Sequence, residues 1–303
     1  MGPVWAGTDA GNDEPHGWAG LAVKNFLDPL SDTSAPRYAL ESDDEDEINP
    51  LPRGDRGVQR AAKFEIKASV SSQPCATLIV ASGNAGKFWA RGAHLGEQGG
   101  SVFANDVTVG MMFTMKDTSI HIVVSEATTR LPVWAMHSYA ETILDFYRPK
   151  SLILLDTYAV PTYISSQPFS FSNAPARFLQ TKAIFAPSPH LQPFGSPNLV
   201  HSTSAAFMAI AALRSLREDV AFPTSLLLLP SQHLERHRPT NIVPSLTPVH
   251  DTNDGWSAGL MSKAHYQLLQ AAGQETSAEW KDPGKRDLPS RRLDEVGESG
   301  MYM

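Results

Sequence analysis

The sequence is short of cysteine and of long apolar runs. Cys75 is the single cysteine in 303 residues, so the chain can form neither an internal disulfide nor a thiolate metal cluster. The longest apolar candidate is 226–229, far below the roughly twenty residues that cross a bilayer. No apolar secretory segment opens the chain. We therefore expect a soluble protein of a reducing compartment, cytoplasmic or nuclear, with no membrane partner.

The sequence also lacks a cluster of one charge outside its first fifth. The formal net charge is -7, and residues 1–61 hold 12 acids and 5 bases, which accounts for all of it. Residues 62–303 hold 20 acids and 20 bases. Because this balanced body offers no basic footprint for a phosphate backbone, nucleic acid is excluded as an expected partner.

Catalytic and cofactor motifs are missing too. No Gly-x-Ser-x-Gly elbow occurs. The turn 82–87 has two residues between Gly83 and Gly86-Lys87, where a phosphate loop has four, and Phe88 follows instead of Ser or Thr. The histidines of 233–237 lack the glutamate directly after the first histidine that a zinc-protease motif has, and Cys75 lies in an apolar strand. We expect no catalytic residues, no cofactor and no metal.

What the sequence does contain is an alternation of strand and helix patterns. Residues 64–70 alternate apolar and polar, which predicts a half-exposed strand. Residues 75–81 are continuously apolar, as in a strand covered on both faces. They end in the turn 82–87, where we expect glycines at positive φ. Strand patterns at 107–113 and 120–124 form a hairpin-like pair, so we expect a mixed sheet.

The second half continues this alternation. A helical period runs over 133–147 and leads into a strand at 151–156. A second helix, with small apolar residues and Ser202 as its cap, precedes a strand at 224–229, and a last helix covers about 255–272. This order predicts an α/β layered domain with a mixed central sheet flanked by helices.

Two features between these elements bear on function. Asp156 and Thr157 follow a buried strand, where open α/β sheets often carry ligand groups, but a polar residue that simply closes the strand is the favoured explanation. Residues 158–200 form a long connection with one short strand candidate at 182–185. Loops of that length are usually functional or disordered.

We divide the chain into three parts. Residues 1–61 form an acidic leader that includes the run 41–47, and we expect it to be disordered, either as an arm for a basic partner or as a solubilising segment. Residues 62–273 form the α/β domain. Residues 274–303 carry proline and glycine without an apolar period, and we expect a flexible tail.

The tail ends in Met301-Tyr302-Met303. This tip offers a thioether, an amphipathic ring and the terminal carboxylate together, and carboxylates at chain ends are often captured by pockets of partner proteins. We interpret these three residues as a partner-binding site. The alternative, that any chain must end in some residues, stays open at this point.

The order of several phrases resembles one family. They are 78–84 (LIVASGN), 197–201 (PNLVH) followed by Ala205-Ala206, a strand after Phe222-Pro223, and the terminal hydrophobic-Tyr-X motif. Together they look like proteasome assembly chaperone 1 over residues 62–272 and the tip. The 158–200 connection and the long tail depart from that family.

The resemblance implies an α/β protein that forms a heterodimer with proteasome assembly chaperone 2. It also implies binding to the α-ring of the 20S proteasome through α subunits. The tip would insert between α subunits, with Met301 as the hydrophobic position, Tyr302 as the tyrosine and the Met303 carboxylate facing a pocket lysine. Two alternatives remain: an α/β enzyme of phosphorylase or hydrolase type that uses the strand ends near Ser82 and Asp156, and a scaffold for another ring-shaped partner.

Overall fold

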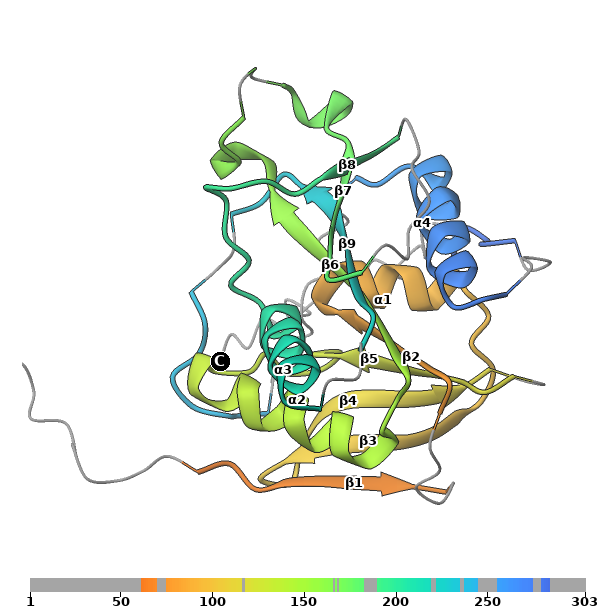
Figure 1. Cartoon of the computed structure of the whole chain (residues 1–303), viewed down its shortest axis with the longest axis vertical. Helices are drawn as coiled ribbons and strands as arrows, with labels where there is room; N and C mark the ends of the chain where they lie inside the picture. Colours follow the sequence, from red (N-terminus) through yellow and green to blue (C-terminus); the bar gives the residue numbers. More distant parts are fainter. Residues whose placement is uncertain are drawn as a thin grey trace, which may run out of the picture. The chain divides into compact units, whose positions relative to one another are not determined.

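Nine strands and four helices make up the part of the chain that the structure describes (Figure 1). This structure is a computed structural model, and it describes residues 61–69, 75–115, 118–165, 167, 169–182, 190–218, 222–234, 237–244, 255–274 and 279–283. The strands are β1 (Phe64–Ala68), β2 (Thr77–Ser82), β3 (Gln98–Ala104), β4 (Val107–Thr114), β5 (Ile120–Ser125), β6 (Ser151–Ala159), β7 (Ala176–Gln180), β8 (Leu191–Pro193) and β9 (Thr224–Ser231). The helices are α1 (Gly83–Gly92), α2 (Val133–Tyr147), α3 (Thr203–Glu218) and α4 (Ala258–Ala271), with short 3-10 turns at Val160–Thr162 and Phe171–Asn173.

All nine strands belong to one mixed sheet with the order β1-β3-β4-β5-β2-β6-β9-β7-β8. The four central strands, β5, β2, β6 and β9, run parallel. β1, β3 and β4 join them by antiparallel pairing on one side, and β7 pairs antiparallel with β9 on the other. The predicted mixed α/β layered fold is confirmed.

Helices cover both faces of this sheet. α2 and α3 share an apolar core with alternate residues of the central strands, such as Leu78 and Val80. α1 and α4 share the second core with the intervening residues, such as Ile79 and Ala81. Figure 1 shows α2 and α3 together on one side and α1 and α4 on the other. The period of two in the strands therefore assigns each side chain to one layer.

This coverage explains the strand patterns in the sequence. Every residue of β2 and of β9 is buried, because both faces of a central parallel strand are packed. β1 alternates between half-buried and exposed residues, because helix packing reaches only one of its faces. α2 has the predicted bounds and stops at Arg148, whose left-handed backbone donates its N–H to the Leu144 carbonyl.

The turn predicted at 82–87 is shorter than expected. Gly83 has the expected positive φ of 59°, but α1 begins at this residue, so Gly86 is helical. Gly86 is required for a different reason: a Cβ there would overlap the carbonyl of Ala81, the last apolar residue of β2. Its missing side chain lets α1 lie directly against the strand.

Three strands differ from the prediction. The sequence pattern does not predict β3, because this strand opens with Gln98, Gly99 and Gly100, and glycine is depleted in strands. Gly100 is needed there, since a Cβ would come within 2.9 Å of the Ala68 Cα in β1. The strand expected at 182–185 falls mostly outside the described residues, whereas β7 and β8 lie within the long 158–200 connection.

The chain returns to the domain after α4. Trp280 is buried, and its indole N–H donates to the Trp89 carbonyl of α1 at 3.0 Å. The next residue, Lys281, donates its backbone N–H to the Gly92 carbonyl at 3.0 Å. A Cβ on Gly92 would overlap both the Trp280 ring and the Lys281 carbonyl. The packed domain therefore extends past residue 273, where the sequence pattern placed its end.

Candidate functional site

The predicted partner-binding residues, Met301, Tyr302 and Met303, lie outside the described residues, as does the leader up to residue 60. The predictions of a disordered leader and of a flexible tail beyond residue 283 therefore stay predictions. Within the described part, polar side chains gather at the carboxyl ends of the central parallel strands. This is the edge at which ligand groups of open α/β sheets usually lie.

Three polar residues form one row across the sheet. The β2–β5 register places Ser82 opposite Ser125, and the β2–β6 register, with Ala81 opposite Leu155, places Ser82 level with Asp156. All three follow the Leu78 and Val80 side of the sheet, which faces α2 and α3. All three are nearly inaccessible, with exposed fractions of 0–6%.

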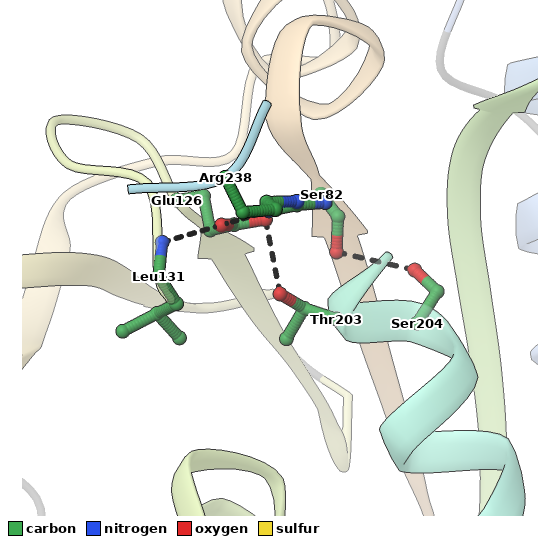
Figure 2. Close-up of polar contacts among 6 residues, drawn as sticks. All are labelled: Ser82, Glu126, Leu131, Thr203, Ser204 and Arg238. Atoms are coloured by element: carbon green, nitrogen blue, oxygen red, sulfur yellow. Dashed lines mark hydrogen bonds and ion pairs between the residues drawn. The ribbon is translucent and has the colours of Figure 1, made fainter. Parts of the chain in front are cut away.

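The amino end of α3 closes over this row. The Ser204 hydroxyl lies 3.3 Å from the Ser82 hydroxyl and donates to it, and the Thr203 hydroxyl donates to Glu126 at 3.0 Å (Figure 2). The predicted cap residue behaves otherwise: the Ser202 hydroxyl has no hydrogen-bond partner among the described residues. The N-terminal polar residues of α3 therefore bond mainly across to the sheet.

Glu126 is the centre of the polar contacts. It follows β5 with a left-handed backbone (φ 53°), and it is only 3% exposed. One carboxylate oxygen accepts from the Leu131 backbone N–H at 2.7 Å and from the Arg238 guanidinium at 2.6 Å. The other accepts from Thr203. Figure 2 shows these donors converging from three separate segments. A buried carboxylate held in this way is fully satisfied.

Asp156 lies in a different environment. Burial raises the pKa of its carboxyl to about 6; the Ser202 and Ser204 hydroxyls and the Thr157 backbone N–H lower the pKa, but by less than burial raises it. One oxygen accepts from the Thr157 N–H at 2.8 Å, while the other has no hydrogen-bond partner among the described residues. The nearby serines influence the carboxyl without completing a hydrogen bond to that oxygen.

The polar row lies where an active site would lie, but the amino end of α3 covers it. Ser82 is bonded to Ser204, and no histidine bonds to Ser82 among the described residues, so they show no Ser-His pair at this position. Sequence reasoning found Asp156 but missed Glu126, Thr203 and Arg238. Glu126 follows a buried strand as Asp156 does, so the same strand-end rule could have found it.

A second polar feature lies beyond β6. The Arg177 guanidinium is buried and stacks 3.9 Å from the centre of the Tyr163 ring, with Tyr158 and Phe169 also within 6 Å. It donates to the Pro193 carbonyl at 3.1 Å. A shallow cavity of about 650 Å³ borders this cluster and is lined by Val160, Pro161, Tyr163, Ser165, Phe169, Ser170, Phe171, Ser172 and Gln232.

The other candidates of the sequence behave as structural residues. Cys75 is 1% exposed, and burial raises the pKa of its thiol to about 12, which keeps it protonated and unreactive. His233 and His237 are exposed and lie outside any helix. The described residues contain no group of three His, Cys, Asp or Glu side chains that could hold a metal ion. None of the described helices has the length and hydropathy of a membrane span.

Comparison with known proteins gives structural likeness only. No family model and no curated protein matches the sequence. Among solved structures, the chain is similar to Pyrococcus furiosus PbaB, an archaeal proteasome activator (12% identity, TM-score 0.44, 71% of this chain and 91% of that one). It is also similar to P. furiosus PbaA, an archaeal homolog of proteasome-assembly chaperone (9%, 0.44, 71% and 88%), and to an MTA/SAH nucleosidase (12%, 0.33, 66% and 96%). Likeness at these TM-scores carries no functional conclusion.

Proposed function

We propose that this protein is a non-enzymatic proteasome assembly chaperone. It acts in the cytoplasm or nucleus as a heterodimer with a second assembly chaperone, binds the α-ring of the 20S proteasome and promotes its assembly. The observation that carries the proposal is the terminal Met301-Tyr302-Met303 on a chain whose internal phrases follow the order of that family. The closed polar layer around Ser82 supports the non-enzymatic part of the proposal.

The family phrases fall on the elements that build the domain. Residues 78–84 form most of the central strand β2 and the start of α1. Residues 197–201 lead into α3, and Phe222-Pro223 leads into β9. These segments position the sheet and its covering helices, which suits a domain whose task is to present surfaces.

Trp280 anchors the described part of the C-terminal segment on α1. The described part of this segment ends at Pro283, and residues 284–303 separate it from the end of the chain. As a flexible tether these residues would span about 25 Å on average. A three-residue tip binds weakly alone, but a domain docked through a broader surface holds it at high local concentration. Tip and domain together then give firm but reversible capture.

The test removes Met301, Tyr302 and Met303 from the full chain and measures capture of α-ring intermediates. We expect at least about a tenfold loss of affinity, with heterodimer formation unchanged. A matched control keeps all three side chains but adds two residues after Met303, which moves the carboxylate out of place. We expect this extended chain to bind as weakly as the deletion variant. Undiminished α-ring binding by the deletion variant would refute the proposal.

One observation keeps a second function in view. Asp156 has a raised pKa and an unpartnered oxygen at the strand ends, as a general acid of an α/β hydrolase or phosphorylase would. If the protein cleaved nucleosides or esters, Asp156→Asn would abolish that turnover. If the chaperone proposal holds, the same variant leaves α-ring capture unchanged.

A further inference from the structure

β1 is the end strand of the sheet, and its outer edge has no partner strand among the described residues. Figure 1 shows β1 in orange at the bottom of the view, with β3 on its inner side. An end strand presents a row of unpaired N–H and C=O groups and is therefore a template for another strand. The opposite end of the sheet differs, because β8 has three residues and ends in Pro193.

The hydrogen bonds to β3 show which groups of β1 point outward. The Lys63 carbonyl accepts from the Asn105 N–H at 3.0 Å, and the Ser69 N–H donates to the Gly99 carbonyl at 2.9 Å. Backbone groups alternate along an antiparallel strand, so residues 65 and 67 also face β3. The N–H and C=O groups of Phe64, Ile66 and Ala68 consequently face away from the sheet.

We propose that β1 pairs antiparallel with β1 of a second copy of this chain, about a two-fold axis that passes beside Ile66. In this register Ile66 lies opposite Ile66 of the second copy, and Phe64 lies opposite Ala68. Each of these residues has its backbone groups on the open edge, so the two strands exchange a full set of hydrogen bonds. The two nine-stranded sheets then form one continuous sheet.

The charges of β1 select this register. Glu65 of one copy lies opposite Lys67 of the other, and the two-fold axis repeats the pair. A shift of two residues in one direction would place Glu65 against Glu65, and a shift in the other direction would place Lys67 against Lys67. Directly opposed like charges destabilise a strand pair, and opposite charges stabilise it. The charges therefore favour the Ile66 register over both neighbouring registers.

Side-chain packing agrees with the same arrangement. A two-fold axis perpendicular to the sheet keeps Phe64, Ile66 and Ala68 of both copies on one face, where they are half-buried under α2. Phe64 already packs edge-on against Tyr139 with ring centres 5.7 Å apart. Phe64 against Ala68 also matches a large side chain with a small one. The remaining exposed area of these three residues is covered when the sheets join.

In other proteins, charged residues on an end strand often prevent it from pairing with a second molecule. The charges of β1 fit this role less well. Charges of one sign repel a second copy in every register, whereas Glu65 and Lys67 repel it in the two neighbouring registers and attract it in the Ile66 register. Lys67 is held on the outer face, with its ammonium group 4.7 Å from the centre of the Phe103 ring. This ring belongs to β3, so in the single chain the ammonium group leans toward the inner neighbour strand. The pairing does not depend on the proposed function.

The test uses charge reversal in the full-length protein, with sedimentation velocity over a range of concentrations. We expect Glu65→Lys alone and Lys67→Glu alone to raise the dimer dissociation constant at least about tenfold, because each creates opposed like charges. The double variant restores the opposite pairing and should return to within about threefold of the wild type. An equimolar mixture of the two single variants should form mixed dimers, since both lysines of one strand then face glutamates of the other.

Ala68→Pro provides a second, independent variant. It removes an outward N–H without touching the hydrogen bonds to β3, and it should leave a monomer. Melting temperatures within a few degrees of the wild type show that each variant is folded. A wild-type chain that stays monomeric up to about 0.1 mM would overturn the proposal. So would a double variant no better than the single variants, because the dimer would then use another surface.

Discussion

Glu126 and Asp156 are two buried acids at the same edge of the sheet with different surroundings. Glu126 accepts hydrogen bonds from a hydroxyl, a backbone N–H and a guanidinium. Asp156 accepts one backbone N–H, and burial dominates its pKa. Sequence position placed Asp156 at a strand end. It could not show that Arg238, 112 residues further along the chain, neutralises the carboxylate of Glu126. Long-range pairing of this kind is decided by the fold.

The Asp156 carboxyl predicts a fall in stability as pH rises. Its pKa is about 6 in the folded chain against an ordinary value of 3.8. The folded state therefore holds this proton more tightly than the unfolded state, and the advantage disappears as pH rises from about 4 through 6. The difference between these two pKa values corresponds to about 3 kcal/mol of stability that is lost by neutral pH. We expect Asp156→Asn to remove this loss, so that the variant is more stable than the wild type at pH 7.

Urea unfolding between pH 4 and pH 7 measures this effect. Asp106→Asn is the matched control, because Asp106 is exposed in a turn with φ of 65°, which asparagine tolerates. The control should keep the wild-type pH dependence. A wild-type stability that is flat across this range would show that Asp156 titrates normally in the folded protein.

At the level of elements, Glu126 joins three segments that the sequence keeps far apart. They are the loop after β5, the amino end of α3 and the segment 237–244. The last segment is also held by the Trp134 indole N–H, which donates to the Thr240 carbonyl at 3.0 Å. The carboxylate therefore positions α3 over the polar row and keeps 237–244 beside α2.

We expect Glu126→Gln to lower the free energy of unfolding by about 3 kcal/mol, because it removes the negative charge that faces the Arg238 guanidinium while both groups are largely buried. Asp145→Asn is the contrast. It breaks the pair with Arg214, and the side chains of Arg214 and Asp145 are 29% and 63% exposed, so it should cost at most about 1 kcal/mol. Equal effects in urea unfolding would show that Glu126 contributes no more than a surface pair.

Most helices, the central strands, β4 and the end strand β1 could be predicted from the sequence, whereas β3, β7 and β8 could not. α2, β2 and β9 have long patterns whose period equals that of the element. β3 contains two glycines, of which Gly100 is needed for the close approach of β1, and β7 and β8 are short strands stabilised mainly by their neighbours. In the polar row, the residues at strand ends could be predicted from the sequence. Their partners from α3 and from 237–244 could not.

For the whole molecule, the return of residues 279–283 to α1 extends the packed part of the chain past α4. The tail pattern after residue 274 is polar and gave no sign of this return, because the single apolar residue that anchors it, Trp280, stands alone. Trp280 packs against Gly92, a helical glycine whose missing side chain makes room for the indole ring. A large side chain and a distant glycine form one packing unit that no local pattern contains.

We therefore expect Gly92→Ala to displace residues 279–283 from α1. Hydrogen exchange should show loss of protection at the Lys281 amide, which bonds to the Gly92 carbonyl, and trypsin should cut after Lys281 faster than in the wild type. Gly195→Ala is the control, because a Cβ there meets nothing within 4 Å. Unchanged protection at Lys281 in the Gly92 variant would contradict the packing described.

The two layers also differ in their chromophores. Trp89, Trp256 and Trp280, three of the six tryptophans, are buried in the layer of α1 and α4. The layer of α2 and α3 holds buried tyrosines instead, at 139, 147 and 158, with Trp134 at its margin. Indole emission from Trp89, Trp256 and Trp280 therefore reports on one side of the sheet, and phenol absorbance from the three buried tyrosines reports on the other. Fluorescence of these tryptophans and absorbance of these tyrosines can therefore follow the unfolding of each layer separately.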